Sequence, residues 1–162
     1  MIEARKEGME IFYVLPLDHT LSEGQRVQVS IDWNRRYRLM RLHFAAEMVL
    51  EIISKILPEI SRIGAHISQE KARIDYQWPD NISVIFPEVR QECEGIILSD
   101  LEIINKFSDE KEQRRYWEVK GFSGVPCGGT HLRRTGEVGE IKLKRRNPGK
   151  GKERVEIELC ED

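Results

Sequence analysis

The clearest alternation of apolar and charged residues lies near the C-terminus. Two runs there place an apolar residue at every second position: Ile141 and Leu143 in the first, and Val155, Ile157 and Leu159 in the second. Between them lies Asn147–Gly149, an Asn-Pro-Gly turn signal. Alternation in steps of two is typical of half-buried strands. The pattern therefore predicts an antiparallel hairpin, with lysines of the first arm facing glutamates of the second.

A period of three and four residues follows Asp32. The apolar positions with this spacing are Leu39, Leu42, Ala46, Leu50, Ile53 and Leu57. Such spacing is typical of a helix with one buried face. Asp32 is a suitable N-cap for a helix beginning near Trp33, and Pro58 marks its end because the residue before a proline resists helical geometry.

The remaining chain predicts shorter elements. Residues 10–31 are expected to be extended, with strands at 11–17 and 27–31 around a turn-rich stretch at 18–25. Alternation over 63–78 predicts a hairpin that turns at 69–71. Residues 79–95 have helical spacing, 96–107 have strand composition, and 112–122 fit neither element clearly. The prediction is an α+β fold in which a mostly antiparallel sheet packs against the long helix, with residues 1–31 leading into a domain at 32–162.

Composition narrows the class of protein. The chain has 162 residues, which suits one domain, and 33% of them are charged. No apolar run reaches the roughly 18 residues of a membrane helix, and the polar start at Met1–Gly8 does not resemble a secretory signal. The three cysteines are too few and too scattered for a disulfide scaffold. They favour a reducing compartment, so a cytoplasmic location is expected.

The net charge of −2 hides local basic clusters. The cationic residues considered as partners for a polyanion are Arg35, Arg36, Lys142, Lys144, Arg145, Arg146, Lys150 and Lys152. Clusters of this kind permit binding to nucleic acid without requiring it. On charge alone, two solvated faces are the preferred interpretation.

Two short segments carry candidate metal ligands. Cys127 and His131 lie four positions apart around Gly128 and Gly129, whose lack of side chains allows a tight path and close approach of a ligand. A thiolate and an imidazole suit zinc. Alone, this pair is equally compatible with a buried cysteine near a surface histidine.

The second segment is on the long helix. His43 and Glu47 are four residues apart and so share one helical face. By themselves they are more simply interpreted as a surface histidine–glutamate pair. Together the two segments supply four potential ligands, the pattern of a single metal site. The other histidines, His19 and His66, have no such partner and are interpreted as surface or loop residues.

Four blocks in order resemble the alanyl-tRNA editing proteins, over most of the chain from about Asp18 to Leu159. The blocks are Asp32–His43, Gly64–Tyr76, Cys127–Gly139 and Asn147–Arg154. The resemblance implies the fold of the editing domain of alanyl- and threonyl-tRNA synthetases. It also implies zinc bound by two helix residues and by the Cys and His of the later loop, and binding of the 3′ end of tRNA, which makes the basic clusters a candidate phosphate-binding surface.

The implied activity is hydrolysis of tRNA for alanine that wrongly carries serine or glycine. His43, Glu47, Cys127 and His131 are then the metal ligands, with Glu47 either a ligand or the base for the attacking water. The implied substrate-binding positions are Phe44, Gly128, Gly129 and Thr130.

The chain departs from the family pattern at two positions. Glu47 replaces the second histidine of the helix, and Phe44 replaces a threonine whose hydroxyl helps to recognise the amino acid. Carboxylate oxygen also binds zinc, so the site can be retained. These departures leave an alternative, a non-catalytic tRNA-binding module with an altered metal site.

Overall fold

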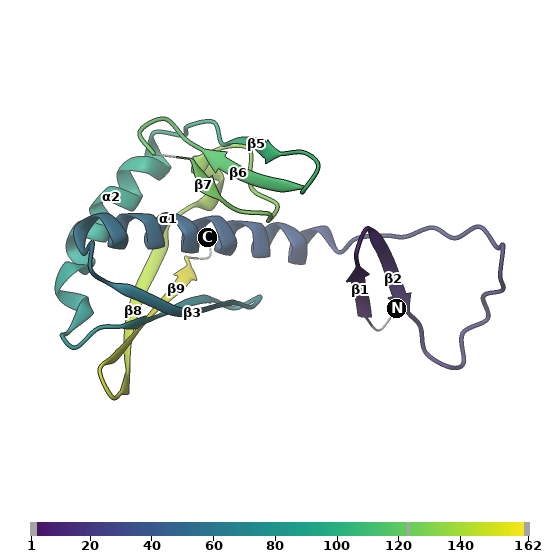
Figure 1. Ribbon diagram of the computed structural model, residues 1–162, viewed down its shortest axis with the longest axis horizontal. Coiled ribbons are helices and arrows are strands. Elements are labelled where there is room, and N and C mark those ends of the chain that lie inside the picture. The colour runs from purple at the N-terminus through teal and green to yellow at the C-terminus, as the bar shows by residue number, and fades with distance from the viewer. Residues whose placement is uncertain (1–2, 123, 161–162) are drawn as a thin grey trace. The chain divides into compact units, whose positions relative to one another are not determined.

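The computed structural model describes residues 3–122 and 124–160 and divides the chain into two units, 1–31 and 32–162 (Figure 1). In the first unit, strand β1 (Glu3–Glu7) pairs antiparallel with β2 (Glu10–Val14) around a turn in which Gly8 has a φ of 61°. The predicted strand at 11–17 is therefore shorter and begins one residue earlier, and β1 was not predicted.

The predicted strand at 27–31 is wrong. These residues form no helix or strand, and Val27, Val29 and Ile31 are all more than half exposed. Alternation alone does not make a strand, because the backbone also needs a paired neighbour. Among the described residues, none pairs with this stretch.

The second unit is built around helix α1 (Trp33–Ile56), which the sequence predicted. The Asp32 carboxylate caps it by accepting a hydrogen bond of 3.0 Å from the Arg35 backbone N–H. The helix ends two residues before Pro58, as expected. Its apolar side is buried, and the Phe44 ring on the opposite flank contacts Trp117 edge-on, with ring centroids 4.9 Å apart.

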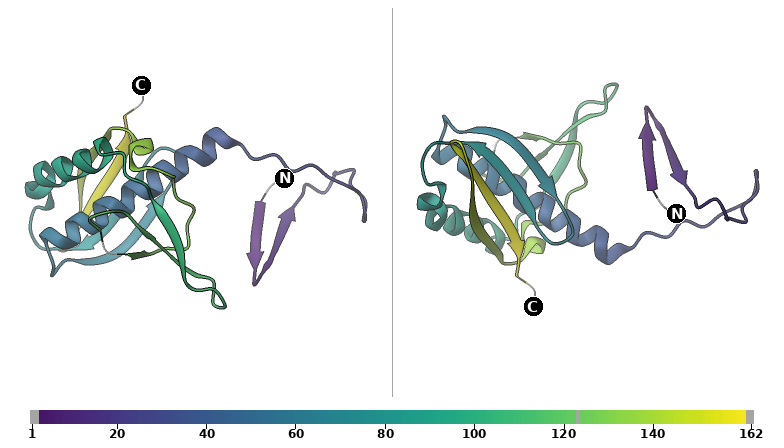
Figure 2. Two further views of the ribbon diagram at one scale, coloured as in Figure 1. Left: turned by 90° about the horizontal axis from the view of Figure 1, so that it is seen from above. Right: turned by 90° about the horizontal axis from the view of Figure 1, so that it is seen from below.

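Two antiparallel sheets lie on either side of α1 (Figures 1 and 2). The four-stranded sheet has the order β3–β4–β9–β8, and its strands are β3 (Ser61–Ile67), β4 (Ala72–Gln77), β8 (Ile141–Gly149) and β9 (Lys152–Leu159). The three-stranded sheet has the order β5–β6–β7, with β5 (Ile104–Asp109), β6 (Arg114–Glu118) and β7 (Val125–Pro126). This arrangement confirms the α+β fold and the hairpin predicted at 63–78.

The second helix begins and ends later than predicted. A 3-10 helix at Ile82–Ile85 precedes α2 (Phe86–Leu98), so the first residues of the predicted strand at 96–107 are helical. The helix ends where Asp100 adopts a φ of 43°, and strand β5 starts at Ile104. The β-branched composition of 96–107 wrongly predicted a strand at its start, because Ile96 and Ile97 pack against the core from a helix and not from a sheet.

The C-terminal hairpin is confirmed, but its turn is displaced. The tight turn is Lys150–Gly151, where φ is 57° and 68°. A two-residue hairpin loop needs a positive φ at both positions to match the twist of its strands. Residues 147–149 belong to β8 and are irregularly paired. The predicted cross-strand pairing occurs, for example between Lys144 Nζ and Glu158 Oε2 at 2.7 Å.

A second 3-10 helix, η2 (Thr135–Val138), connects the loop after β7 to β8. None of the helices among the described residues has the length and apolarity needed to cross a membrane.

Candidate metal centre

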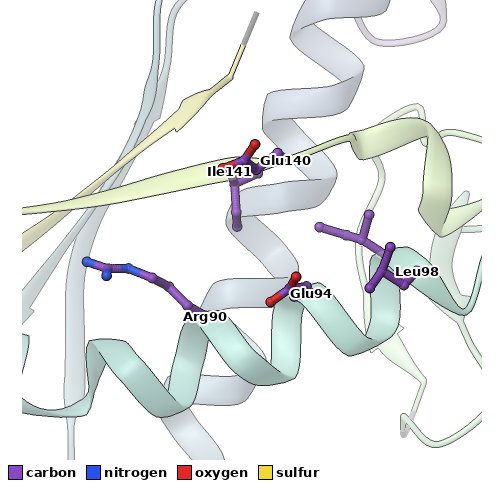
Figure 3. Close-up of a pocket in the computed structure, with 6 residues that line it drawn as sticks. Arg90, Glu94, Leu98, Glu140 and Ile141 are labelled. Atoms are coloured by element: carbon purple, nitrogen blue, oxygen red, sulfur yellow. The ribbon is translucent and has the colours of Figure 1, made fainter. Parts of the chain in front are cut away.

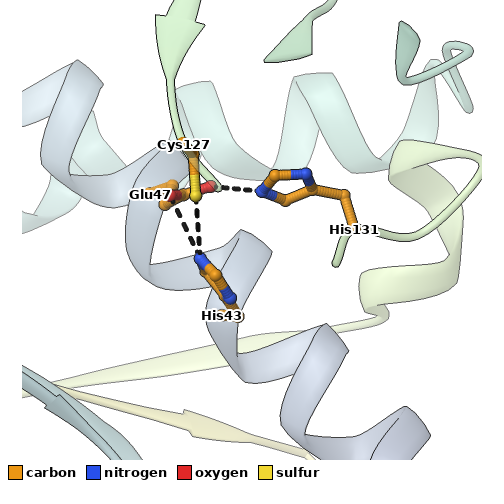
Figure 4. Close-up of side chains that lie close together, drawn as sticks. All are labelled: His43, Glu47, Cys127 and His131. Atoms are coloured by element: carbon orange, nitrogen blue, oxygen red, sulfur yellow. Dashed lines mark hydrogen bonds and ion pairs between the residues drawn. The ribbon is translucent and has the colours of Figure 1, made fainter. Parts of the chain in front are cut away.

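All four residues predicted as ligands meet at one point (Figure 4). His43 and Glu47 project from consecutive turns of α1, and Cys127 and His131 come from the segment that follows β7. One donor atom from each residue lies within 4.8 Å of the other three. Residues 84 positions apart in the sequence are thus brought into direct contact.

The closest contacts join Glu47 to the two imidazoles. His43 Nε2 is 3.1 Å from Glu47 Oε1, and His131 Nε2 is 2.9 Å from Glu47 Oε2. Cys127 Sγ is 3.4 Å from His43 Nε2. Because each Glu47 oxygen faces a different ring, the carboxylate is directed into the cluster and not toward solvent.

The donor set fits zinc. Zinc accepts thiolate, imidazole and carboxylate at about 2.0 to 2.3 Å, which places tetrahedral donors roughly 3.3 to 3.8 Å apart. The separations of 2.9 and 3.1 Å are slightly shorter than this and that of 3.4 Å falls within it, so small side-chain shifts would accommodate the ion. The cluster is also mostly shielded from water, since the side chain of His131 is fully covered and those of His43 and Glu47 are 24% and 17% exposed.

The electrostatics of the cluster favour its charged forms. Hydrogen bonds that the protonated His43 ring donates to Cys127 and Glu47 raise the pKa of His43 to about 10. Burial would raise the pKa of Glu47, but hydrogen bonds from His131 and His43 outweigh it and lower the pKa to about 2. The pKa of Cys127 is lowered in the same way, because hydrogen bonds from both histidines outweigh the effect of its burial. The lowered pKa values of Glu47 and Cys127 favour the anionic forms that bind a cation.

The loop is held by its backbone and by a neighbouring strand. Gly129 N–H donates to Cys127 Sγ at 3.2 Å, and Arg115 on β6 donates to the Gly128 carbonyl. A Cβ on Gly129 would lie 2.0 Å from Cε1 of His43, whereas a Cβ on Gly128 would meet nothing within 4 Å. Only Gly129 must therefore be glycine, because the His43 imidazole leaves no space for a side chain there.

The sequence of the chain is similar to that of known tRNA editing proteins. A sequence profile described as "Threonyl and Alanyl tRNA synthetase second additional domain" matches residues 118–156, which include Cys127 and His131. The alanyl-tRNA editing protein AlaX-M of Pyrococcus horikoshii is 30% identical over 166 residues, covering 96% of this chain and 72% of that protein. AlaX-M of Saccharolobus solfataricus is 32% identical over 171 residues, covering 93% and 71%.

The chain belongs to the alanyl-tRNA editing protein family. It is also similar to a segment of a much longer protein, the alanine–tRNA ligase of Ignicoccus hospitalis, at 32% identity over 88% of this chain and 18% of the ligase. The profile match begins on β6 and so excludes α1. The two predicted ligands on α1, His43 and Glu47, lie outside the matched segment.

A cleft opens beside His43. Its volume is about 440 Å³, and it is lined by Arg36, Leu39, Met40, His43, Ile67, Gly128, Gly129 and Thr130. Arg36 Nη2 donates to the Thr130 hydroxyl at 2.7 Å across its mouth. A smaller hollow of about 120 Å³, which includes Glu47, Arg62 and Arg73 in its lining, adjoins His43 on the side of β3 and β4. Three of the predicted substrate-binding residues, Gly128, Gly129 and Thr130, thus line the larger cleft.

Phe44 does not. Its side chain is 1% exposed and lies in the core between α1 and β6, against Trp117 and, at 6.2 Å between ring centroids, His131. It packs against the inner side of the cluster, and its contact with substrate stays a prediction. Position 44 follows His43 by one residue, which rotates it by about 100° around the helix, toward β6.

The predicted tRNA-binding residues divide into two groups. Lys144, Arg145 and Arg146 each form an ion pair with a glutamate of β9. The other five are exposed and form no ion pair with the described part of the chain: Arg35, Arg36, Lys142, Lys150 and Lys152. The charge available to a polyanion is therefore smaller than the sequence suggested.

One residue at the cluster was missed by the sequence interpretation. Asn105, on β5, places Oδ1 2.7 Å from Nδ1 of His131. Asparagine is common on protein surfaces, and nothing in the local pattern marks this one. Only the pairing of β5 with β6 brings it to the cluster.

Another concavity lies between α2 and the start of β8 (Figure 3). Its volume is about 380 Å³, and it is lined by Arg90, Glu94, Ile97, Leu98, Glu140 and Ile141. None of the four cluster residues contributes to it. Its lining combines an apolar floor with charged residues of both signs and offers no reactive group comparable with the cluster.

Proposed function

We propose that this protein is an aminoacyl-tRNA deacylase that hydrolyses the ester between a wrong amino acid and tRNA for alanine. The convergence of His43, Glu47, Cys127 and His131 beside an open cleft is the observation that carries this proposal. Membership of the alanyl-tRNA editing family supports the choice of substrate. The released amino acid is serine or glycine, and the 3′ end of the tRNA enters the cleft.

The four residues are proposed to hold Zn²⁺. When bound there, zinc would supply Lewis-acid polarisation of the ester carbonyl. Glu47 serves as the fourth ligand in place of the family histidine, since both of its oxygens already face imidazole nitrogens inside the cluster. A carboxylate held between two rings has no free oxygen directed at the cleft, which disfavours its alternative role as the base.

Residues of the cleft bind and orient the substrate in this proposal. Gly128 leaves open space for the aminoacyl ester, and Gly129 lets the loop lie close to His43. The Thr130 hydroxyl can donate to a carbonyl or hydroxyl oxygen while it accepts from Arg36. Arg36 at the mouth is placed for a phosphate of the acceptor end, and Arg35, Lys142, Lys150 and Lys152 are further candidates for phosphate contacts. The apolar walls, Leu39, Met40 and Ile67, exclude water from the ester.

The protein is placed in the cytoplasm, where mischarged tRNA is produced. The three cysteines support this location because none of them forms a disulfide within the described residues.

Release of amino acid from Ser-, Gly- and Ala-tRNA for alanine tests the proposal, with zinc content measured on the same preparation. We expect hydrolysis of the first two esters, and loss of both zinc and activity in Cys127→Ala. Cys160→Ser is the matched control, because Cys160 lies beyond the end of β9 and outside the cluster. Absence of release with all three esters would support the alternative of a non-catalytic tRNA-binding module.

A further inference from the structure

Asn105 lies next to the buried metal-ligand candidate His131. The Asn105 side chain meets Nδ1 of His131, while Nε2 of the same ring faces Glu47 inside the cluster. The two ring nitrogens therefore have different partners on opposite sides. The His131 side chain is fully covered, whereas Asn105 lies on the exposed strand β5 and contacts the ring from its outer side.

The chemistry of imidazole assigns a role to this contact. A neutral ring carries one proton, and the nitrogen that binds a cation must present a lone pair. If Nε2 faces the cation, Nδ1 carries the proton and needs an acceptor. The amide oxygen of Asn105 is 2.7 Å away, and no other hydrogen-bond partner of Nδ1 is found in the described part of the chain.

The strand pairing holds both groups in place. Asn105 is directly opposite Trp117 in the register of β5 and β6. The Trp117 side chain is 1% exposed, and its ring lies 6.2 Å from that of His131 between centroids. The strand pair therefore fixes the backbone of Asn105 beside the buried Trp117 and His131 rings.

Charge explains why a neutral acceptor suits this position. The Glu47 carboxylate and the Cys127 thiolate together carry two negative charges, which balance a divalent cation. An amide oxygen accepts a hydrogen bond from Nδ1–H and leaves this balance unchanged, and a carboxylate at this exposed strand position would accept the same hydrogen bond with an added negative charge.

We propose that Asn105 is a positioning residue that fixes the tautomer and ring orientation of His131 for metal binding. This role rests on the proposed metal-dependent function and extends it to a residue that binds neither metal nor substrate.

The test compares zinc affinities of full-length variants by competition with a chromophoric chelator. Asn105→Leu keeps the approximate size of the side chain but removes the acceptor, and we expect zinc to bind about 10- to 100-fold more weakly. Asn105→Asp retains an acceptor and should bind zinc at least as tightly as the wild type. Ser108→Ala, on the same strand but away from the cluster, is the control and should match the wild type.

Two further measurements separate positioning from general structural damage. Thermal unfolding of the metal-free proteins should give the same midpoint for the wild type and Asn105→Leu. In NMR spectra of the zinc-loaded proteins, the Nδ1–H proton of His131 should be protected from exchange in the wild type and unprotected in Asn105→Leu.

Unchanged zinc affinity in Asn105→Leu would overturn the role of Asn105 and leave the proposed function intact. So would a loss of affinity accompanied by an equal loss of stability in the metal-free protein, without rescue by Asn105→Asp. A wild-type protein that binds no divalent cation would overturn both this inference and the proposed metal dependence.

Discussion

At residue 129 the choice of amino acid is decided by the neighbouring imidazole of His43. The loop passes so close to this ring that a side chain of any size would overlap it. The adjacent Gly128 faces open space and has no such constraint. Of these two neighbouring glycines, only Gly129 therefore excludes a side chain, and substitution of each in turn can test this.

Gly129→Ala should weaken zinc binding by at least about tenfold, because the new methyl group must displace His43 or the loop that carries Cys127. Overpacking should also lower the free energy of unfolding by about 1 to 3 kcal/mol. Zinc titration and thermal unfolding of the metal-free protein measure the two effects.

Gly128→Ala is the matched control for that substitution. It should keep the zinc affinity and the unfolding midpoint of the wild type, because its Cβ meets no atom. Equal losses in both variants would show that general stiffening of the loop, and not contact with His43, causes the effect.

Glu47→His tests the ligand role of the carboxylate. An imidazole at this position is the family's own choice and is a good zinc ligand, so the variant should bind as much zinc as the wild type or more. Metal content per protein chain, measured by atomic emission, gives the answer. A folded Glu47→His protein without zinc would contradict the assignment of Glu47 as a ligand.

At the scale of elements, the β8–β9 hairpin contains a buried carboxylate that ties three segments together. Glu153 is 1% exposed and accepts hydrogen bonds from Arg145 at 2.5 and 2.6 Å and from Asn147 at 2.8 Å. It also accepts from the backbone N–H of Ile82 at 3.3 Å, which links the hairpin to the first 3-10 helix. The hydrogen bonds from Arg145 hold the pKa of Glu153 below its ordinary value.

Glu153→Gln should lower the free energy of unfolding by about 2 kcal/mol at neutral pH, the usual size for hydrogen bonds to a charged group. Because the pKa of Glu153 is lowered on folding, its contribution is complete above the unfolded value of about 4.3 and declines as the pH falls through the folded value. The difference between wild type and variant should therefore shrink below about pH 4. Denaturant unfolding at several pH values measures it.

Glu158→Gln is the control for this prediction. Glu158 pairs with Lys144 on the same hairpin, but the lysine is half exposed, so the loss should be at most about 1 kcal/mol. A loss as large as that of Glu153→Gln would mean that burial does not distinguish the two pairs.

At the scale of the whole molecule, the buried core and the cluster both belong to residues 32–162. All of the buried hydrophobic residues found in the structure lie between Met40 and Leu159. In the first unit, by contrast, the β1–β2 hairpin exposes most of its side chains, and an isolated two-stranded hairpin is marginally stable. We propose that residues 32–162 form the editing domain and fold independently.

A fragment comprising residues 32–162 should therefore unfold cooperatively, with a midpoint within a few degrees of the full chain, and should bind zinc with the same affinity. Circular dichroism during heating and a zinc titration test this expectation. A fragment that unfolds without cooperativity would show that residues 1–31 contribute to the core.

Much of this molecule could be predicted from its sequence because local patterns have local causes. The cap at Asp32, the period of α1 and the alternation around the C-terminal turn each reflect a single element. Predictions failed where packing against another part of the chain decides whether a segment becomes helix or strand. Residues 27–31 alternate but have no neighbouring strand, and the residues after Gly95 continue a helix because the core accepts them in that form.

The sequence by itself indicated the family and the two segments that carry the four candidate ligands. The tertiary structure decided that these segments meet, that Phe44 faces the core and that Asn105 reaches His131. The physical reason is the sequence distance over which each contact acts. Spacing along one helix or loop fixes which side chains share a face. Contacts across 84 residues exist only after the helix and both sheets have packed around a common core.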